Sequence, residues 1–198
     1  MAKIIPYQTQ RFQPIDYKRA DDPALSQAVG QLDLFNTSNE QSVQLPLAQN
    51  TFDLALKLDL RNDPSAERYY LKSIENHEST AHALCNLGVM AAHKQKMALA
   101  VDFFTKALIE EPRHIESHFN LANVYFIAGN IPLSILHFKV VIQIAPEFKD
   151  VYFNLGLAYL ELEDFKAARI NLQHYKSLNP DKNLQNLNLI LDSLASII

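Results

Sequence analysis

The 198-residue chain has four glycines, one cysteine and no tryptophan, and the shortages of glycine and cysteine each exclude a class of site. Four glycines are too few to build the loops that wrap around phosphate groups, so a P-loop or dinucleotide-binding fingerprint is not expected. A single cysteine, Cys85, cannot form an internal disulfide or a cysteine-ligated zinc site. With 18 basic and 22 acidic residues, the net charge of -4 argues against a surface that coats nucleic acid.

Long apolar runs are also missing. No uninterrupted apolar stretch approaches the length that spans a membrane, and the first residues, MAKIIPYQTQRF, lack the apolar core of a secretory signal. The chain is nevertheless 48% hydrophobic and 20% charged, which is enough to bury a core. We therefore expect a folded, soluble and cytoplasmic protein.

What the sequence does contain is an internal repeat. Residues 81–114, 115–148 and 149–182 align without gaps at an offset of 34 residues, and each segment ends near a proline. The aligned positions carry a large residue, Leu, Gly or Ala, Ala or Tyr, a small residue, and a large apolar residue. These sets are Leu84, His118, Tyr152; Leu87, Leu121, Leu155; Gly88, Ala122, Gly156; Ala91, Tyr125, Tyr159; Ala100, Ser134, Ala168; and Phe104, Phe138, Leu172.

This pattern resembles the tetratricopeptide repeat (TPR), a pair of helices that stacks on its neighbours to bury one continuous core. The small residues would let the two helices of a pair approach closely, and each proline would end a second helix. The predicted fold is all-α, an α-solenoid of TPR helix-turn-helix repeats with a C-terminal capping helix.

The flanks of the three repeats differ from them. Residues 50–60 read as one helix, and Asp63-Pro64 starts another, which together predict a divergent first repeat without the Leu-Gly pair. The expected organisation is an irregular N-terminal arm at 1–46, four repeats at 47–182 and a capping helix at 183–198. The apolar stripe of that helix is broad, which leaves a surface for a partner protein or for a homodimer as the alternative to simple capping. The stripe comprises Leu184, Leu187, Leu191, Leu194 and Ile198, widened by Ile190 and Ile197.

Asparagine recurs at the repeat period, at Asn86, Asn120 and Asn154. The TPR resemblance places this column on the first helices, which line the groove of the solenoid. It is similar to the asparagine ladder of O-GlcNAc transferases, which holds extended substrate chains, although nothing of their catalytic half is present. An amide both donates and accepts, so such a ladder can bind a peptide backbone. The alternative is that the amides bond the backbone of the neighbouring helix. The predicted peptide-binding residues are Asn86, Asn120, Asn154, Phe119, Asn123, Phe126, Phe153 and Leu157.

The same face is predicted to be apolar and aromatic, with a few acids and no Lys or Arg. TPR chaperone adaptors that hold a terminal carboxylate place basic residues here, so that specificity is not expected. An extended or helical segment with apolar anchors is the better match.

Signals for catalysis or metal binding are weak. His114 and His118 have the i, i+4 spacing of a metal pair, but His118 occupies a packing position and HIESH lacks the glutamate placement of HExxH, so no metal is predicted. An enzyme would have to use His82, Cys85 and His93 on one helix. No third group orients Cys85 as nucleophile and His82 as base, so a half-buried structural thiol is the preferred interpretation.

One short motif lies in the N-terminal arm: Gln31-Leu32-Asp33-Leu34-Phe35. It resembles the pentapeptide by which bacterial replication and repair proteins dock on the DNA sliding clamp, with Leu34 and Phe35 entering an apolar pocket. The alternative is that these side chains pack on the first repeat near Phe52 and Leu54.

The predicted function is a non-catalytic protein–protein interaction scaffold that binds a peptide segment in the TPR groove, as an assembly factor or co-chaperone. Two alternatives remain: a replication or repair accessory protein that docks on the sliding clamp through residues 31–35, and a secretion-system chaperone. No cofactor, direct nucleic-acid contact or membrane contact is expected.

Overall fold

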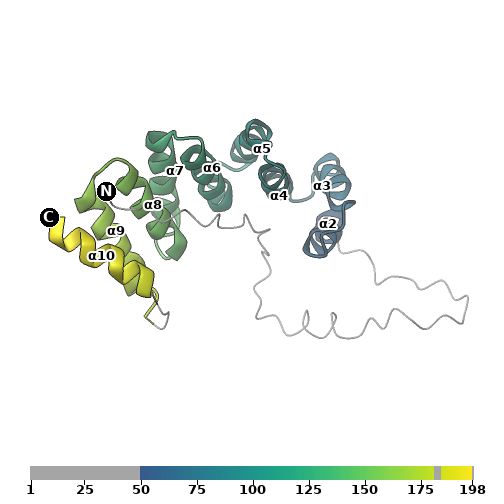
Figure 1. The fold of residues 1–198 in the computed structure, drawn as a ribbon. Helices are drawn as coiled ribbons and strands as arrows, with labels where there is room; N and C mark the ends of the chain where they lie inside the picture. The colour runs from purple at the N-terminus through teal and green to yellow at the C-terminus, as the bar shows by residue number, and fades with distance from the viewer. Residues whose placement is uncertain (1–49, 181–183, 198) are drawn as a thin grey trace, which may run out of the picture. The chain divides into compact units, whose positions relative to one another are not determined.

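The computed structural model describes residues 50–180 and 184–197 (Figure 1). All regular secondary structure within these residues is helical, which confirms the all-α prediction. The described helices are too short or too polar to span a membrane. The helices are α2 (Thr51–Leu60), α3 (Ala66–Glu75), α4 (Thr80–His93), α5 (Met97–Glu110), α6 (Ile115–Ile127), α7 (Ile131–Ile144), α8 (Lys149–Glu161), α9 (Phe165–Ser177) and α10 (Gln185–Ile197). The docking motif at residues 31–35 lies outside the described residues.

The described residues fall into two units, which divide between Ser79 and Thr80. The smaller unit is the hairpin of α2 and α3. Phe52 on α2 packs against Tyr70 on α3 with ring centroids 5.9 Å apart, and the Tyr70 hydroxyl donates to Asp59 at 3.0 Å. Both rings are buried, so this short hairpin has an apolar centre of its own.

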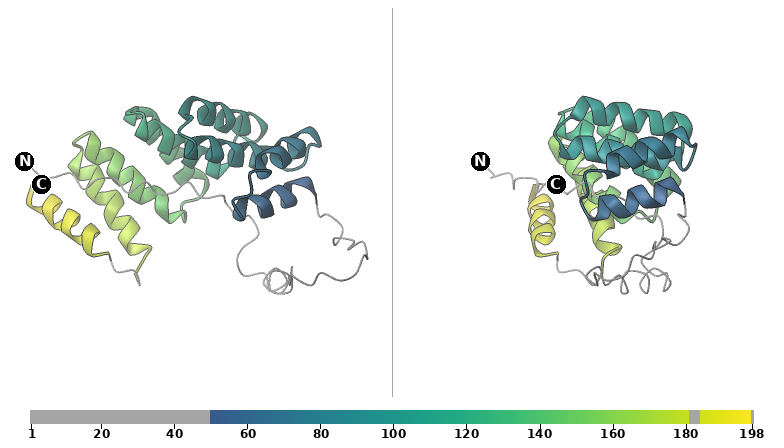
Figure 2. Two further views of the ribbon diagram at one scale, coloured as in Figure 1. Left: turned by 45° about the vertical axis from the view of Figure 1, so that its right-hand side comes forward. Right: turned by 90° about the vertical axis from the view of Figure 1, so that its right-hand side faces the viewer.

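The larger unit consists of three hairpins, α4–α5, α6–α7 and α8–α9, followed by α10 (Figure 2). The second helix of each hairpin packs on the first helix of the next, so α5 contacts α6 and α7 contacts α8. The first helices also contact one another, α4 with α6 and α6 with α8. This is the stacking of a solenoid, and it confirms the predicted fold class.

All hairpins share one turn. The second residue after each first helix adopts a positive φ, and the next residue's N–H reaches back to a carbonyl five positions earlier, which is a Schellman motif. In the larger unit these residues are Gln95 (φ 60°), Gly129 (φ 77°) and Glu163 (φ 58°), and the bonds are Lys96 to Ala91, Asn130 to Tyr125 and Asp164 to Tyr159, at 2.9, 2.8 and 3.0 Å. The smaller unit repeats the arrangement, with Asn62 at φ 56° and Asp63 bonded to Leu58. A divergent repeat would have this turn.

The small residues of the first helices are required by close packing. A Cβ added at Gly88 would lie 2.5 Å from the ring of Phe104, and one at Gly156 would lie 2.7 Å from Leu172. Phe104 and Leu172 are fully buried, so neither can retreat into solvent. The repeat pattern therefore records where the two helices of a hairpin touch.

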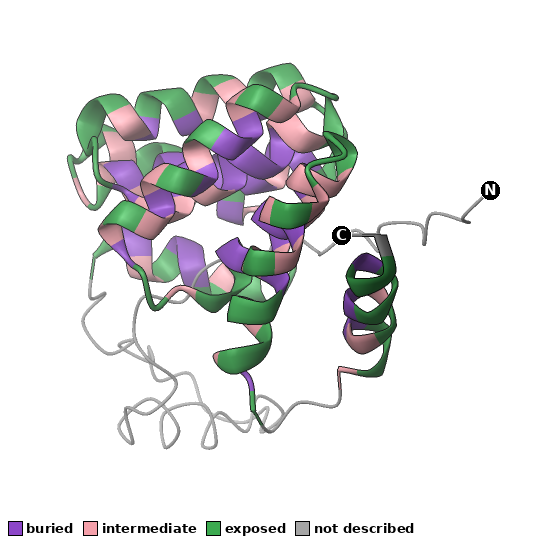
Figure 3. Cartoon of the chain, turned by 90° about the vertical axis from the view of Figure 1, so that its left-hand side faces the viewer, coloured by how far each residue is buried: buried purple, intermediate pink, exposed green. Residues whose placement is uncertain are grey.

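The last helix covers the end of the stack. Leu187, Leu191 and Leu194 on α10 are buried against Ala168 and Leu172 of α9. Figure 3 shows α10, beside the C-terminus, with buried residues along one side and exposed residues along the other. Leu189 is the large apolar residue on its exposed side, at 63%. Most of the described stripe is thus used within the chain, as a cap would use it.

Candidate peptide-binding face

The candidate site lies on the contacting first helices α4, α6 and α8. We define the first-helix face as the residues predicted to bind peptide: Asn86, Asn120, Asn154, Phe119, Asn123, Phe126, Phe153 and Leu157. The structure divides them into two groups. The four asparagines are buried, whereas the three phenylalanines and Leu157 are partly exposed. Apolar side chains therefore reach the surface and the amides lie beneath them.

Three of the asparagines take part in bonds between neighbouring first helices. The Nδ2 of Asn154 donates to the Oδ1 of Asn123 at 2.8 Å, which joins α8 to α6. The Nδ2 of Asn120 points to the Sγ of Cys85 at 3.6 Å, which joins α6 to α4. The amide donors thus contact the neighbouring helix, but their partners are side chains and not the backbone that the alternative expected.

An acceptor is left over in this network. The Oδ1 of Asn154 is buried and has no hydrogen-bond partner among the described residues. Buried polar atoms are nearly always paired, so an unpaired amide oxygen indicates a donor that the described chain does not supply.

The aromatic residues of the face also hold the hairpins together. Phe119 lies 5.8 Å from Phe138 and 5.0 Å from Phe148, measured between ring centroids. Phe153 lies 5.2 Å from Tyr175 and packs against the apolar cluster of α9 and α10. One side of each ring is therefore structural, and its partial exposure leaves the other available for contact.

The face carries little positive charge. Lys149, the first residue of α8, is the one Lys or Arg on α4, α6 and α8. Glu116 and Asp150 lie in the first turns of α6 and α8. Attraction between this surface and an acidic peptide is accordingly weak.

Cys85 does not have the surroundings of a nucleophile. Its side chain is fully buried, and burial raises the pKa of the thiol to about 12. A reactive cysteine needs the opposite shift and an accessible sulfur. The ring of His82, the proposed base, lies edge-on to that of His114, with centroids 4.7 Å apart.

His114 and His118 do not form the metal pair that their spacing allows. The two ring nitrogens of His118 lie 2.9 Å from Nδ1 of His137 and 3.1 Å from the carbonyl of Pro112, so both are engaged. His114 instead begins α6, where its Nδ1 accepts the N–H of Ser117 at 3.2 Å. Burial lowers the pKa of His114 to about 4, with a further contribution from His82, so the imidazole is neutral near pH 7.

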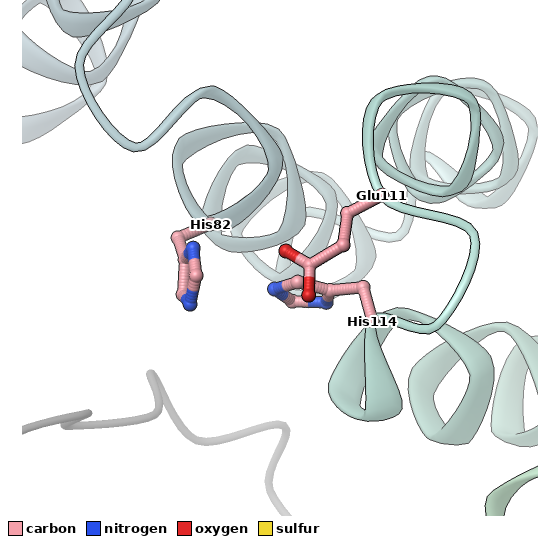
Figure 4. A group of neighbouring side chains, drawn as sticks. All are labelled: His82, Glu111 and His114. Carbon is pink, nitrogen blue, oxygen red and sulfur yellow. The ribbon is translucent and has the colours of Figure 1, made fainter. Parts of the chain in front are cut away.

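Figure 4 shows the neighbours that His114 has in place of His118: His82 from α4 and Glu111 from the end of α5. One ligand atom from each of the three residues lies within 4.8 Å of the others. Sequence spacing could not reveal this group, because its members belong to three elements. The sequence offers one indication of this proximity: His82 and His114 are nearly one repeat apart, and residues at that separation are neighbours in a stack.

Two tetratricopeptide repeat family models match the chain, one over residues 56–115 and the other over residues 149–182. Among curated proteins, the UDP-N-acetylglucosamine–peptide N-acetylglucosaminyltransferase of Giardia intestinalis is 24% identical over 116 residues. That match covers 59% of this chain and 8% of the relative, so the chain spans less than a tenth of the transferase.

Solved structures share the fold at low identity. MamA from Desulfovibrio magneticus RS-1 superposes with a TM-score of 0.62 at 21% identity, covering 74% of this chain and 88% of that one. The first TPR of Spaghetti (RPAP3), bound to the HSP90 peptide SRMEEVD, gives 0.54 at 20% identity, covering 58% and 93%. The Sgt2 TPR domain of Aspergillus fumigatus gives 0.53 at 19%, covering 59% and 78%.

Proposed function

Because this chain is a tetratricopeptide repeat protein, we propose that it is a non-catalytic scaffold whose first-helix face binds a peptide segment of a partner protein. The observation that carries the proposal is the layering of that face. Partly exposed apolar side chains lie over buried amides, and one of these amides, Asn154, has an acceptor without a partner among the described residues. The exposed side chains supply apolar anchors for a peptide, and the buried amides beneath them connect the first helices that present these anchors.

The apolar anchors would supply most of the affinity. Phe126 and Leu157 are partly exposed and lie on adjacent first helices, α6 and α8. Covering such a side chain contributes up to roughly 1.5–3 kcal/mol before ordering costs are subtracted. Two or three anchors therefore suit a peptide that binds moderately and exchanges readily.

The partner segment is proposed to be apolar rather than acidic. The peptide seen on the Spaghetti TPR, SRMEEVD, is rich in carboxylates. Here Glu116 and Asp150 would repel such a ligand, and Lys149 alone among the residues of α4, α6 and α8 would attract it. An assembly factor or co-chaperone that recognises an apolar stretch fits this balance of charge.

A pair of matched variants tests the proposal. Leu157→Glu places a charge on the first-helix face, and Ile170→Glu places the same charge on α9, where Ile170 is 59% exposed. Both proteins and the wild type serve as baits in the native host, with partners identified by mass spectrometry and folding checked by circular dichroism. We expect partners to be lost with Leu157→Glu and retained with Ile170→Glu. Equal retention by both folded variants would refute binding at this face.

A second candidate function rests on the sequence at residues 31–35, which matches the sliding-clamp pentapeptide at all five positions. Surface plasmon resonance of the full chain against a bacterial sliding clamp tests it, with Leu34→Ala and Phe35→Ala combined as the control. Binding that disappears in the double variant supports docking on the clamp, and absence of binding by the wild type eliminates it. Identification of secretion substrates among the captured partners would instead favour the secretion-system chaperone.

A further inference from the structure

Three helices deliver one potential metal ligand each to a single point beside the first-helix face. His82 lies in the first turn of α4, Glu111 directly follows α5, and His114 is the N-cap residue of α6. Figure 4 shows the three side chains converging from these elements. Their ligand atoms lie within 4.8 Å of one another, and all three residues belong to the larger unit.

His114 is the fixed member of the group. It is 2% exposed, and its Nδ1 lies 3.2 Å from the Ser117 N–H nitrogen and 2.9 Å from the Ser117 hydroxyl oxygen. The Glu116 carboxylate lies 3.6 Å from the same nitrogen. Ring orientation is therefore set by contacts on the Nδ1 side, which leaves the Nε2 side directed away from the α6 backbone.

The other two members can adjust to an ion. His82 is partly exposed and Glu111 is exposed, so neither is held in place by a packed core. Zinc binds histidine nitrogen at about 2.0–2.1 Å, which puts neighbouring tetrahedral ligand atoms roughly 3.3 Å apart. Side-chain rotation of His82 and Glu111 is enough to contract a separation of 4.8 Å or less to that distance.

We propose that His82, Glu111 and His114 form a binding site for a divalent transition-metal ion of the zinc class. Two imidazoles and one carboxylate are a ligand set that such ions prefer, and they leave a fourth position for water or for a side chain of a partner. Binding of the ion through Nε2 of His114 would move the ring proton to Nδ1, so that Nδ1 would no longer accept the Ser117 N–H and would donate to the Ser117 hydroxyl oxygen or the Glu116 carboxylate. Hydrogen bonding of this kind to the second ring nitrogen is typical of histidine ligands.

The group belongs to one layer of the stack and is not a general product of the repeat. One period further along the chain, the equivalent positions are Glu116, Ala145 and Phe148. Those three residues provide a single ligand and cannot bind an ion in the same way. The site would therefore join α4 to the α5–α6 corner and leave the next layer unchanged.

Zinc titration of the tag-free, full-length protein by calorimetry tests the site. We expect one ion per chain in the wild type. His82→Asn and Glu111→Gln should each weaken binding by about tenfold or more, since even outer-shell partners are worth 10–100-fold. Two nearby exposed residues supply matched controls, His93→Asn on the same helix as His82 and Glu110→Gln beside Glu111, and both should bind as the wild type does.

Cobalt provides an independent measurement. Co²⁺ in a site with two nitrogens and one carboxylate should give visible absorption bands that are lost in His82→Asn and kept in His93→Asn. The test avoids His114, whose capping role would make a loss of binding ambiguous. Equal zinc affinity in the wild type and His82→Asn, or equal losses in the site variants and their controls, would overturn the proposal.

Discussion

The side chains of Asn154 on α8 and Asn123 on α6 form an amide–amide hydrogen bond of 2.8 Å between two first helices. Because both residues are buried, this bond is shielded from water and fixes how the two helices align. Asn154 belongs to the repeated asparagine column, but Asn123 lies three residues beyond its column member, Asn120. Two members of the column, Asn120 and Asn154, therefore use their amide donors within the scaffold.

Removing either amide of this pair is expected to destabilise the protein. Asn123→Ala leaves the Nδ2 of Asn154 buried without its partner, at a cost of about 1–3 kcal/mol in the free energy of unfolding. Combining Asn123→Ala with Asn154→Ala should cost less than the sum of the single changes, by about 0.5–1.5 kcal/mol. Urea unfolding of the four proteins measures this coupling, and strict additivity would contradict it.

Adding a methyl group to the close-packed glycines should also lower stability. Gly88→Ala and Gly156→Ala force Phe104 and Leu172 to move, and such overpacking costs about 1–3 kcal/mol, offset by about 1 kcal/mol of helix propensity. The measurement is the melting temperature of each variant. Ala122→Gly, the reverse change at the equivalent position of the second repeat, should lower it too, because it reduces helix propensity and removes a buried methyl group. A rise in melting temperature for Gly88→Ala would show that the hairpin is looser than described.

At the positive-φ positions of the hairpin turns, glycine should stabilise the fold and alanine should destabilise it. Glu163 and Gln95 adopt positive φ values that cost a side-chain-bearing residue roughly 1 kcal/mol, so Glu163→Gly should raise the free energy of unfolding by about 0.5–1 kcal/mol. Gly129→Ala should lower it by a similar amount, since nothing within 4 Å of the new Cβ would compensate. Gln143→Gly, at an exposed position inside α7, is the control and should be destabilising.

Acid should weaken the fold through the histidine pair of α6 and α7. Burial lowers the pKa of His137 from 6.5 to about 4 and lowers that of His118, while His137 also stacks on Tyr125. Between pH 6.5 and about 4, these histidines bind protons in the unfolded chain but not in the native state. The free energy of unfolding therefore falls as the pH drops through this range. His137→Gln should flatten this dependence in urea unfolding, and an unchanged slope would show that other groups cause it.

The thiol of Cys85 should react slowly in the native protein. Its pKa of about 12 and full burial leave almost no accessible thiolate near neutral pH, so alkylation must wait for local opening. Thr105→Cys in a Cys85→Ala background provides an exposed comparison on α5 and should react at least about a hundredfold faster. Fast modification of native Cys85, persisting at low pH, would revive the enzyme interpretation.

The repeat columns were sufficient to predict the helical hairpins because a packing contact recurs at each of them. Gly88 and Gly156 lie against Phe104 and Leu172, residues of another column of the same alignment. The shared turn was not predictable in this way. Its backbone conformation is the same at Gln95, Gly129 and Glu163, but three different residue types adopt it.

Contacts between non-equivalent positions were not predicted, because an alignment of repeats compares only equivalent positions. An alignment compares Asn120 with Asn154, but the bond in the structure joins Asn154 to Asn123. The approach of His82 to Glu111 and His114 likewise depends on how one layer sits on another, which no single segment encodes. The predicted peptide-binding role of the asparagines stays a prediction.

Stacking of this kind also determines how the chain would be dismantled. The outer end of the larger unit is α10, which rests on α9 through Leu187, Leu191 and Leu194. Peeling α10 away would bare Leu172 and Ala168 but would leave the contacts of α4, α5, α6 and α7 with one another in place. A protease or an unfoldase working from this end would therefore have to detach the helices one after another. The Asn123–Asn154 bond would break only after α9 had been separated from α8.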